Sequence, residues 1–274
     1  IEVFENDTFK KEYRFLAFIN SYLGLVASGL YDYESSLEYH KISLEISKNI
    51  KDDTIRKREE AALTNNLGLM HLDFNRFEEA LLYFKQALKK TATLRSNNLE
   101  LYAMIIANIG ICEIATGKRK DGLAKINESL KIGEEIKDLN IQILSLLEFS
   151  RFYRNEKDLT KAAYYIDKTL LLSEKKGFKK VETLLLAAEI YTGEKSIVFY
   201  KKYVEVKKIK EQKIQKAKRK FVRIKYETEQ KQVENTYLKQ QNRRNNSILK
   251  RERQKSRITT LFAIICFFAA YLIY

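Results

Sequence analysis

Residues 66–88, NLGLMHLDFNRFEEALLYFKQAL, carry the clearest structural pattern of the chain. A second stretch, NIGICEIATGKRKDGLAKINESL at 108–130, aligns with it without a gap. Each begins Asn-apolar-Gly, and a small residue follows twelve positions after the glycine, at Ala80 and Gly122. A large residue comes four positions later and another small residue three later still, a spacing that puts all three on one helix face. The pattern predicts antiparallel helix pairs, in which small residues allow close approach and the large one fills the groove.

The same frame fits three more places along the chain. The small residue, the large residue and the second small residue fall at Ser36, His40 and Ser43; Ala80, Phe84 and Ala87; Gly122, Ile126 and Ser129; Ala162, Ile166 and Thr169; and Ser196, Tyr200 and Tyr203. The predicted structural positions of the repeat are Gly68, Ala80, Phe84, Ala87, Gly110, Gly122 and Ala162. Five occurrences of one helix-pair pattern predict an all-α solenoid of about five helix pairs, in which each repeat covers its neighbour.

This pattern resembles the tetratricopeptide repeat (TPR) family over residues 9–205, most clearly through Leu67, Gly68, Phe77, Ala80, Phe84 and Ala87. The chain departs from the family in having no proline at all, and three of its repeats exceed the usual length of about 34 residues. The resemblance implies a right-handed superhelix whose concave face binds peptides or proteins.

The family's inward-facing positions map to Asn65, Leu69, Leu72 and Asp73 in the second repeat, Met104, Ile111 and Ile114 in the third, and Leu147, Arg151 and Arg154 in the fourth. The groove would be apolar in its middle with two arginines at one end. Such a groove suits an amphipathic helix or a peptide with an acidic end, because guanidinium groups pair well with carboxylates. The alternative is that these residues only pack between adjacent helices.

The net charge of +15 lies entirely in one segment. Residues 201–257 hold 21 Lys and Arg against 6 Asp and Glu, so the rest of the chain is neutral. Residues Ile214, Ala217, Phe221, Ile224 and Thr228 step by three and four, which is a heptad seam. We therefore expect a solenoid at 1–200 and a basic helical or coiled-coil stalk at 201–257, with a homodimer through 205–238. A single solvated helix is the alternative.

The last 17 residues, 258–274, carry no charge, and we expect them to form a transmembrane helix. The order of repeats, coil and span is similar to that of membrane-anchored bacterial TPR signalling proteins. That resemblance implies an inner-membrane location, repeats on the periplasmic side and a cytoplasmic effector beyond this chain. The basic flank, by the positive-inside rule, would instead lie in the cytoplasm, or it would bind anionic lipid. We favour the family arrangement.

The sequence offers no catalytic constellation, so we expect no enzyme activity, cofactor, metal or nucleic-acid binding in this chain. His40 and His71 fall on repeat positions, and Cys112 lies two residues after Gly110, where small residues pack. There is no Gly-rich phosphate loop and no His-Glu-x-x-His motif. The expected function is a membrane-tethered sensor or adaptor that binds a protein or peptide, in a chain that lacks residues on both sides. The alternative is a tail-anchored cytoplasmic scaffold.

Overall fold

The computed structural model describes the backbone of residues 8–91 and 98–273, and side chains over 13–91 and 98–261 except at 224, 225, 228, 229 and 231–233. Within these residues all regular structure is α-helix. The chain divides into two compact units, residues 1–214, here called the repeat array, and residues 215–274, here called the C-terminal segment. The all-α, TPR-like solenoid predicted from the repeat is confirmed for the repeat array.

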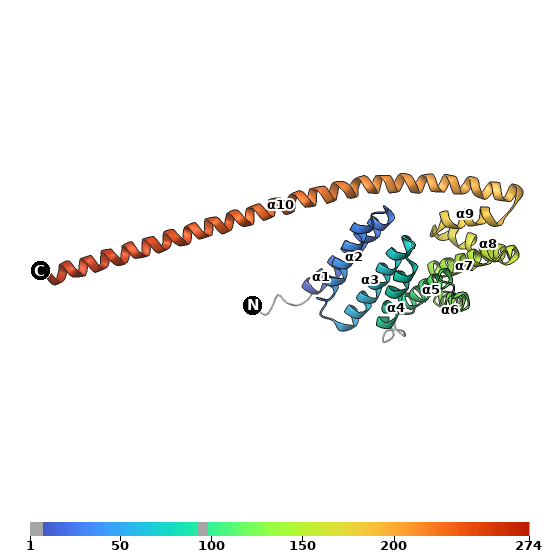
Figure 1. Ribbon diagram of the computed structural model, residues 1–274, viewed down its shortest axis with the longest axis horizontal. Helices are drawn as coiled ribbons and strands as arrows, with labels where there is room; N and C mark the ends of the chain where they lie inside the picture. The colour runs from blue at the N-terminus through green and yellow to red at the C-terminus, as the bar shows by residue number, and fades with distance from the viewer. Residues whose placement is uncertain (1–7, 92–97, 274) are drawn as a thin grey trace. The chain divides into compact units, whose positions relative to one another are not determined.

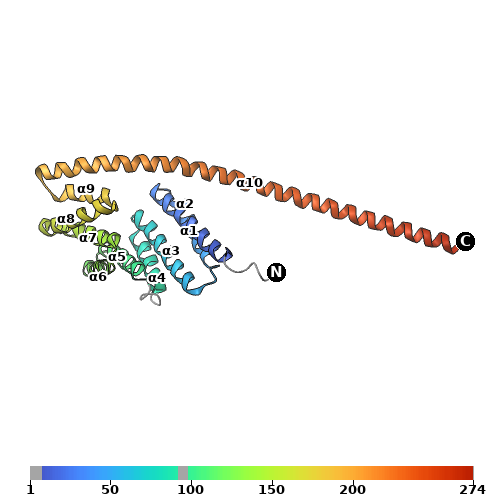
Figure 2. The ribbon, with the colours of Figure 1, turned by 180° about the vertical axis from the view of Figure 1, so that it is seen from behind.

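The helices of the repeat array pair in chain order (Figures 1 and 2). The pairs are α1 (Thr8–Gly29) with α2 (Tyr33–Ser47), α3 (Asp53–Asp73) with α4 (Phe77–Thr91), α5 (Leu99–Ala115) with α6 (Arg119–Glu135), and α7 (Leu139–Asn155) with α8 (Leu159–Lys176). A shorter helix, α9 (Lys180–Ile190), precedes α10 (Gly193–Ile273). Side chains join α9 to the beginning of α10, where the rings of Tyr191 and Phe199 stack with centroids 5.6 Å apart.

Helix ends in the array are built without proline. The turn inside each of the four pairs contains a residue with positive φ: Tyr31, Asn75, Gly117 and Lys157. This left-handed conformation stops a helix and satisfies its last carbonyl groups. Four helices then begin with an aspartate that accepts hydrogen bonds from backbone N–H groups of the first turn: Asp32, Asp52, Asp138 and Asp158. These local signals explain why the family's terminal proline is dispensable here.

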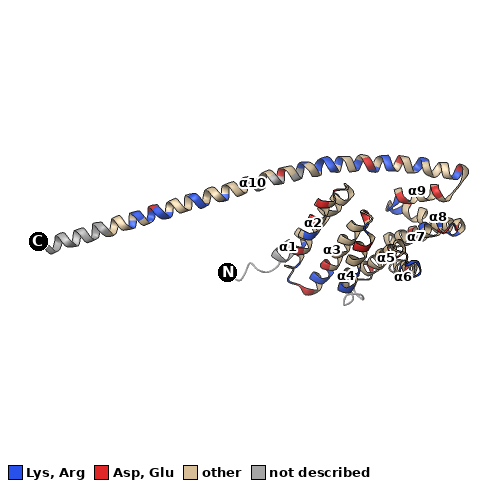
Figure 3. Ribbon diagram, in the orientation of Figure 1, with Lys and Arg blue, Asp and Glu red and all other residues tan. Residues whose placement is uncertain are grey.

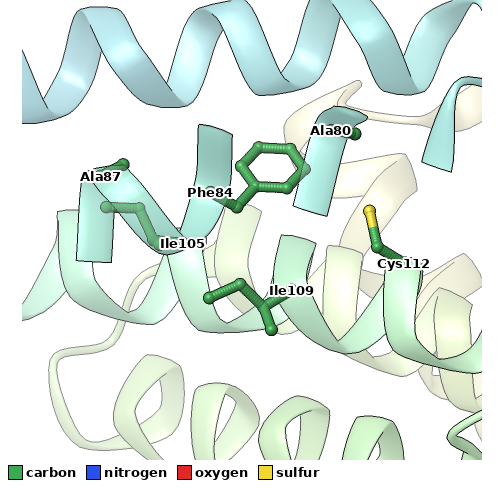
Figure 4. Packing of buried hydrophobic residues seen from close by; sticks show 6 residues of the cluster. All are labelled: Ala80, Phe84, Ala87, Ile105, Ile109 and Cys112. Carbon is green, nitrogen blue, oxygen red and sulfur yellow. The ribbon is translucent and has the colours of Figure 1, made fainter. Parts of the chain in front are cut away.

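Glycines let the two helices of a pair approach closely. Phe84 of α4 lies against Gly68 of α3, where an added Cβ would be 2.5 Å from the Phe84 ring. His40 of α2 lies in the same way against Gly24 of α1. Figure 4 shows Phe84 beside Ala80 and Ala87 of α4, packed towards residues of α5, the next helix along. Large side chains over glycines therefore join the helices within these two pairs, and Phe84 also packs against α5 of the following repeat.

The prediction of a transmembrane helix at 258–274 is wrong. No helix in the described part of the chain combines the length and the apolar composition needed to cross a membrane. The described side chains of α10 up to Arg257 include many lysines and arginines (Figure 3). The described residues beyond Arg257 are 258–261, which are uncharged, and the side chains of 262–273 lie outside the described residues. The inner-membrane location, the periplasmic placement of the repeats and the tail-anchored alternative, which all rest on this span, are withdrawn with it.

Candidate functional site

The first helices of the pairs, α1, α3, α5 and α7, together with α9, form a surface that we call the first-helix face. Polar side chains link successive first helices. Ser28 donates to Asp73 Oδ2 at 2.7 Å, and Asn66 donates to Ser21 Oγ at 2.9 Å, both between α1 and α3. These links hold the first helices in register, so residues at equivalent positions lie in rows across the repeats.

The α1 end of this face is apolar and open to solvent. Phe15, Phe18 and Tyr22 are 62%, 63% and 60% exposed, and Leu25 is also exposed. Their spacing of three, four and three residues puts them on one side of α1, and we call these four residues the α1 stripe. The buried side of α1 carries small residues instead, where Ser36 of α2 donates to the carbonyl of Gly24 at 2.8 Å. Exposed apolar side chains grouped in this way usually mark a site of interaction.

The predicted groove residues of the second and third repeats are mostly half-buried. Leu69, Leu72, Met104, Ile111 and Ile114 all pack against clusters of buried residues. Asn65 is fully buried and accepts a hydrogen bond from Asn108 of α5 at 3.0 Å, so its side chain joins α3 to α5. Asp73 is exposed at the end of α3. In the fourth repeat, Leu147 is buried in the cluster that includes Ala162 and Ile166.

The two predicted arginines at the far end of the face already have carboxylate partners. Arg151 pairs with Glu148 of the same helix. Arg154 pairs with Glu189, which joins α7 to α9. An acidic ligand at this end would therefore have to compete with carboxylates of the chain itself.

Phe18 and Leu25 of the α1 stripe are face residues that the sequence analysis missed. Gly24 occupies in α1 the place that Gly68 occupies in α3, because the next small residue, Ser36, follows it by twelve positions. In α3, Ala62 lies six positions before Gly68 and Leu69 lies one position after it. The equivalent positions around Gly24 in α1 are Phe18 and Leu25. Applying the frame to the first repeat would have placed both residues on the face.

The reactive side chains of the repeat array are packed as structural groups. Burial raises the pKa of the Cys112 thiol to about 12, so it is not a nucleophile at neutral pH. Burial also lowers the pKa of His71, and its ring stacks on Tyr83 with centroids 5.0 Å apart. Over the described residues no three His, Cys, Asp or Glu side chains are grouped so that they would hold a metal ion.

Comparisons with known proteins support the TPR resemblance. A family model described as a tetratricopeptide repeat matches residues 61–94. A comparison with curated proteins found no match.

Three solved structures share the fold. Aspartyl phosphate phosphatase F from Bacillus subtilis is 17% identical with a TM-score of 0.57, over 76% of this chain and 58% of that one. The apo form of RapI is 19% identical with a TM-score of 0.56, over 75% and 70% of the two chains. A signal transduction ATPase with a tetratricopeptide repeat sensor, from Pyrococcus horikoshii, is 19% identical with a TM-score of 0.51, over 71% and 30%. At these identities the likeness is one of fold, and this chain spans little more than half the length of the first structure.

Proposed function

We propose that the repeat array is a protein- or peptide-binding module whose ligand lies along the first-helix face. The observation that carries the proposal is the α1 stripe, three large aromatic rings and a leucine exposed on one helix. Burying an exposed aromatic ring stabilises a complex by about 1.5–3 kcal/mol. Two such rings would therefore supply part of the binding energy of a short peptide. Phe18 and Tyr22 are already oriented together, with ring centroids 6.4 Å apart.

The chemistry of the ligand follows from how the face changes along its length. The α1 end presents aromatic rings, and the half-buried Leu69 and Met104 continue an apolar surface over α3 and α5. An amphipathic helix with apolar side chains three and four residues apart fits such a surface. At the α7 end, Arg151 and Arg154 favour an acidic group on the ligand if it displaces Glu148 or Glu189. Apolar contact at α1 is thus the anchor, and the arginine end adds selectivity.

We also propose that residues 205–238 of α10 pair with a second copy of the chain. The heptad steps from Ile214 to Thr228 support this pairing. A solvated helix of this composition gains little from its own packing and is stabilised by a partner. The side chains of Ile224 and Thr228 lie outside the described residues.

The binding proposal is tested with a random peptide library displayed on phage and selected against the full chain. The selected peptides are then titrated against the chain by fluorescence anisotropy. Replacing Phe18 and Tyr22 together by serine removes two anchoring rings, and we expect the affinity to fall by about tenfold or more. Peptides with acidic ends should in addition lose affinity for a variant with Arg151→Glu and Arg154→Glu.

The matched control replaces Tyr164 and Leu171 by serine. Both are exposed on α8, a second helix of its pair, so they lie off the first-helix face. We expect this control to bind the selected peptides like the unchanged chain. Equal binding by the α1 variant would remove the α1 stripe from the site, and a library with no enriched peptide would argue against the peptide-binding function itself.

A further inference from the structure

A pocket opens beside the start of α9, because α9 is short. α9 has 11 residues, whereas α7 has 17. α10 is longer and continues past the first residue of α9. The pocket has a volume of about 450 Å³. Its walls come from the turn before α9, the first turn of α9 and one side of α10: Gly177, Phe178, Lys179, Lys180, Val181, Glu182, Val206, Ile209, Lys210 and Lys213. Pockets of about 300–1,000 Å³ commonly hold small ligands.

The charged side chains of the pocket leave positive charge unbalanced. Four of the lining residues are lysines and one is a glutamate. Lys210 Nζ pairs with Glu182 at 3.1 Å, and Lys180 Nζ pairs with Glu174, outside the lining, at 2.8 Å. Over the described residues no carboxylate lies within ion-pair distance of Lys179 or Lys213. Lys179 lines the pocket from the turn before α9 and Lys213 lines it from α10, so an anion bound by both would join that turn to α10.

The pocket already stabilises one carboxylate of the chain. Burial acts to raise the pKa of the Glu182 carboxyl. A hydrogen bond from its own backbone N–H and the charges of Lys179 and Lys210 outweigh burial and hold this pKa below its ordinary value. A carboxylate beside these lysines is therefore favoured in its ionised form.

The rest of the lining is apolar. Phe178 and Val181 contribute from the α9 side, and Val206 and Ile209 from α10. Aliphatic and aromatic walls of this kind favour a ligand with an apolar body and disfavour a compact, multiply charged ion, which would lose its hydration there. A carboxylate on an apolar stem would meet both kinds of lining, the lysines and the four apolar side chains.

We propose that this pocket binds a small carboxylate carried on an apolar stem, with the carboxylate between Lys179 and Lys213 and the stem against Val206 and Ile209. The carboxylate has two possible sources, an aliphatic organic acid or the free C-terminus of a peptide that ends in an apolar residue. The site shares no residue with the α1 stripe. A ligand there would join α9 to α10, at the end of the repeat array.

The test is isothermal titration calorimetry on the full chain with three probes: octanoate, N-acetyl-Ala-Leu with a free carboxylate, and inorganic pyrophosphate. We expect saturable 1:1 binding of octanoate or of the dipeptide, and the tighter of the two identifies the source. Replacing Lys179→Asn and Lys213→Gln together should weaken that binding by about tenfold or more. Lys179 has a φ of 52°, which is in the left-handed region. Asparagine is chosen as its replacement because asparagine tolerates this conformation.

The matched control is Lys208→Gln, which removes an exposed lysine of α10 that does not line the pocket. It should bind the probes like the unchanged chain, and all variants should unfold at the same temperature, because neither substituted pocket lysine has an ion-pair partner to lose among the described residues. Three results would overturn the proposal: no saturable binding of either carboxylate, binding that the double variant leaves unchanged, or pyrophosphate binding as tight as that of the carboxylates.

Discussion

At the scale of single residues, His40 and Phe84 occupy the same slot in successive repeats. Each lies over a glycine of the preceding helix, Gly24 and Gly68 respectively. Neither ring nitrogen of His40 has a hydrogen-bond partner among the described residues. Burial lowers the pKa of His40 to about 4. A protonated imidazolium is therefore poorly tolerated in a slot that suits a hydrocarbon ring.

This slot predicts a pH dependence of stability. The pKa of His40 is about 4 in the folded chain and 6.5 in the unfolded chain, so the folded state binds fewer protons between these values. The free energy of unfolding should therefore fall as the pH drops from 6.5 to 4, by about 3 kcal/mol from this group. Urea unfolding followed by circular dichroism at several pH values measures the slope.

His40→Phe is the matching variant, because the second repeat carries Phe84 over Gly68. It should lose most of that slope and keep the slope from carboxylates that titrate in the same range. His71→Phe should flatten the curve less, because burial and two neighbouring cations lower the pKa of His71 while Glu79 raises it. A His40→Phe variant with an unchanged pH profile would contradict a buried, neutral His40.

Sequence spacing predicted which residues share a helix face but not how deeply each is buried. It predicted that Phe84 fills the groove between two paired helices, and in the structure Phe84 lies against Gly68 of the partner helix. It also placed Asn65 on an open groove, whereas the side chain bonds to Asn108, 43 residues away. The carboxylate partners of Arg151 and Arg154 could not be predicted from the sequence either. Ion pairs depend on side-chain conformations and on the relative positions of helices, and residue spacing determines neither.

At the scale of elements, the buried Asn65–Asn108 bond joins α3 to α5 and predicts a non-additive pair of mutations. Asn108→Leu alone leaves the Asn65 carbonyl buried without a donor, and it should destabilise the chain by about 1–3 kcal/mol. Asn65→Leu with Asn108→Leu removes both polar groups and should cost less than the sum of the two single changes. Urea unfolding of the four chains gives the coupling energy. Additive costs would show that the bond contributes nothing specific to the stacking of these repeats.

At the scale of the whole molecule, composition located the basic segment but misjudged the residues after it. The charge pattern predicted a stalk at residues 201–257 that differs from the repeats, and this stays a prediction. An uncharged run of 17 residues was interpreted from composition alone as a transmembrane helix. No described helix is long and apolar enough to cross a membrane. The sequence also did not predict the α9–α10 pocket. Its lysines come from two places about 30 residues apart in sequence, and they line one pocket only because the chain turns at Gly193.

The last prediction concerns the assembly of two chains through α10. Ala217 lies on the heptad seam and Gln215 lies off it, and both are exposed, so neither should disturb the fold when changed to glutamate. We expect the unchanged chain to sediment as a dimer in velocity ultracentrifugation. Ala217→Glu buries like charges at the seam and should give monomers, whereas Gln215→Glu, with the same change in charge, should leave the dimer intact. A chain that stays monomeric at every concentration would exclude the pairing, and a dimer that tolerates Ala217→Glu would place its interface outside residues 205–238.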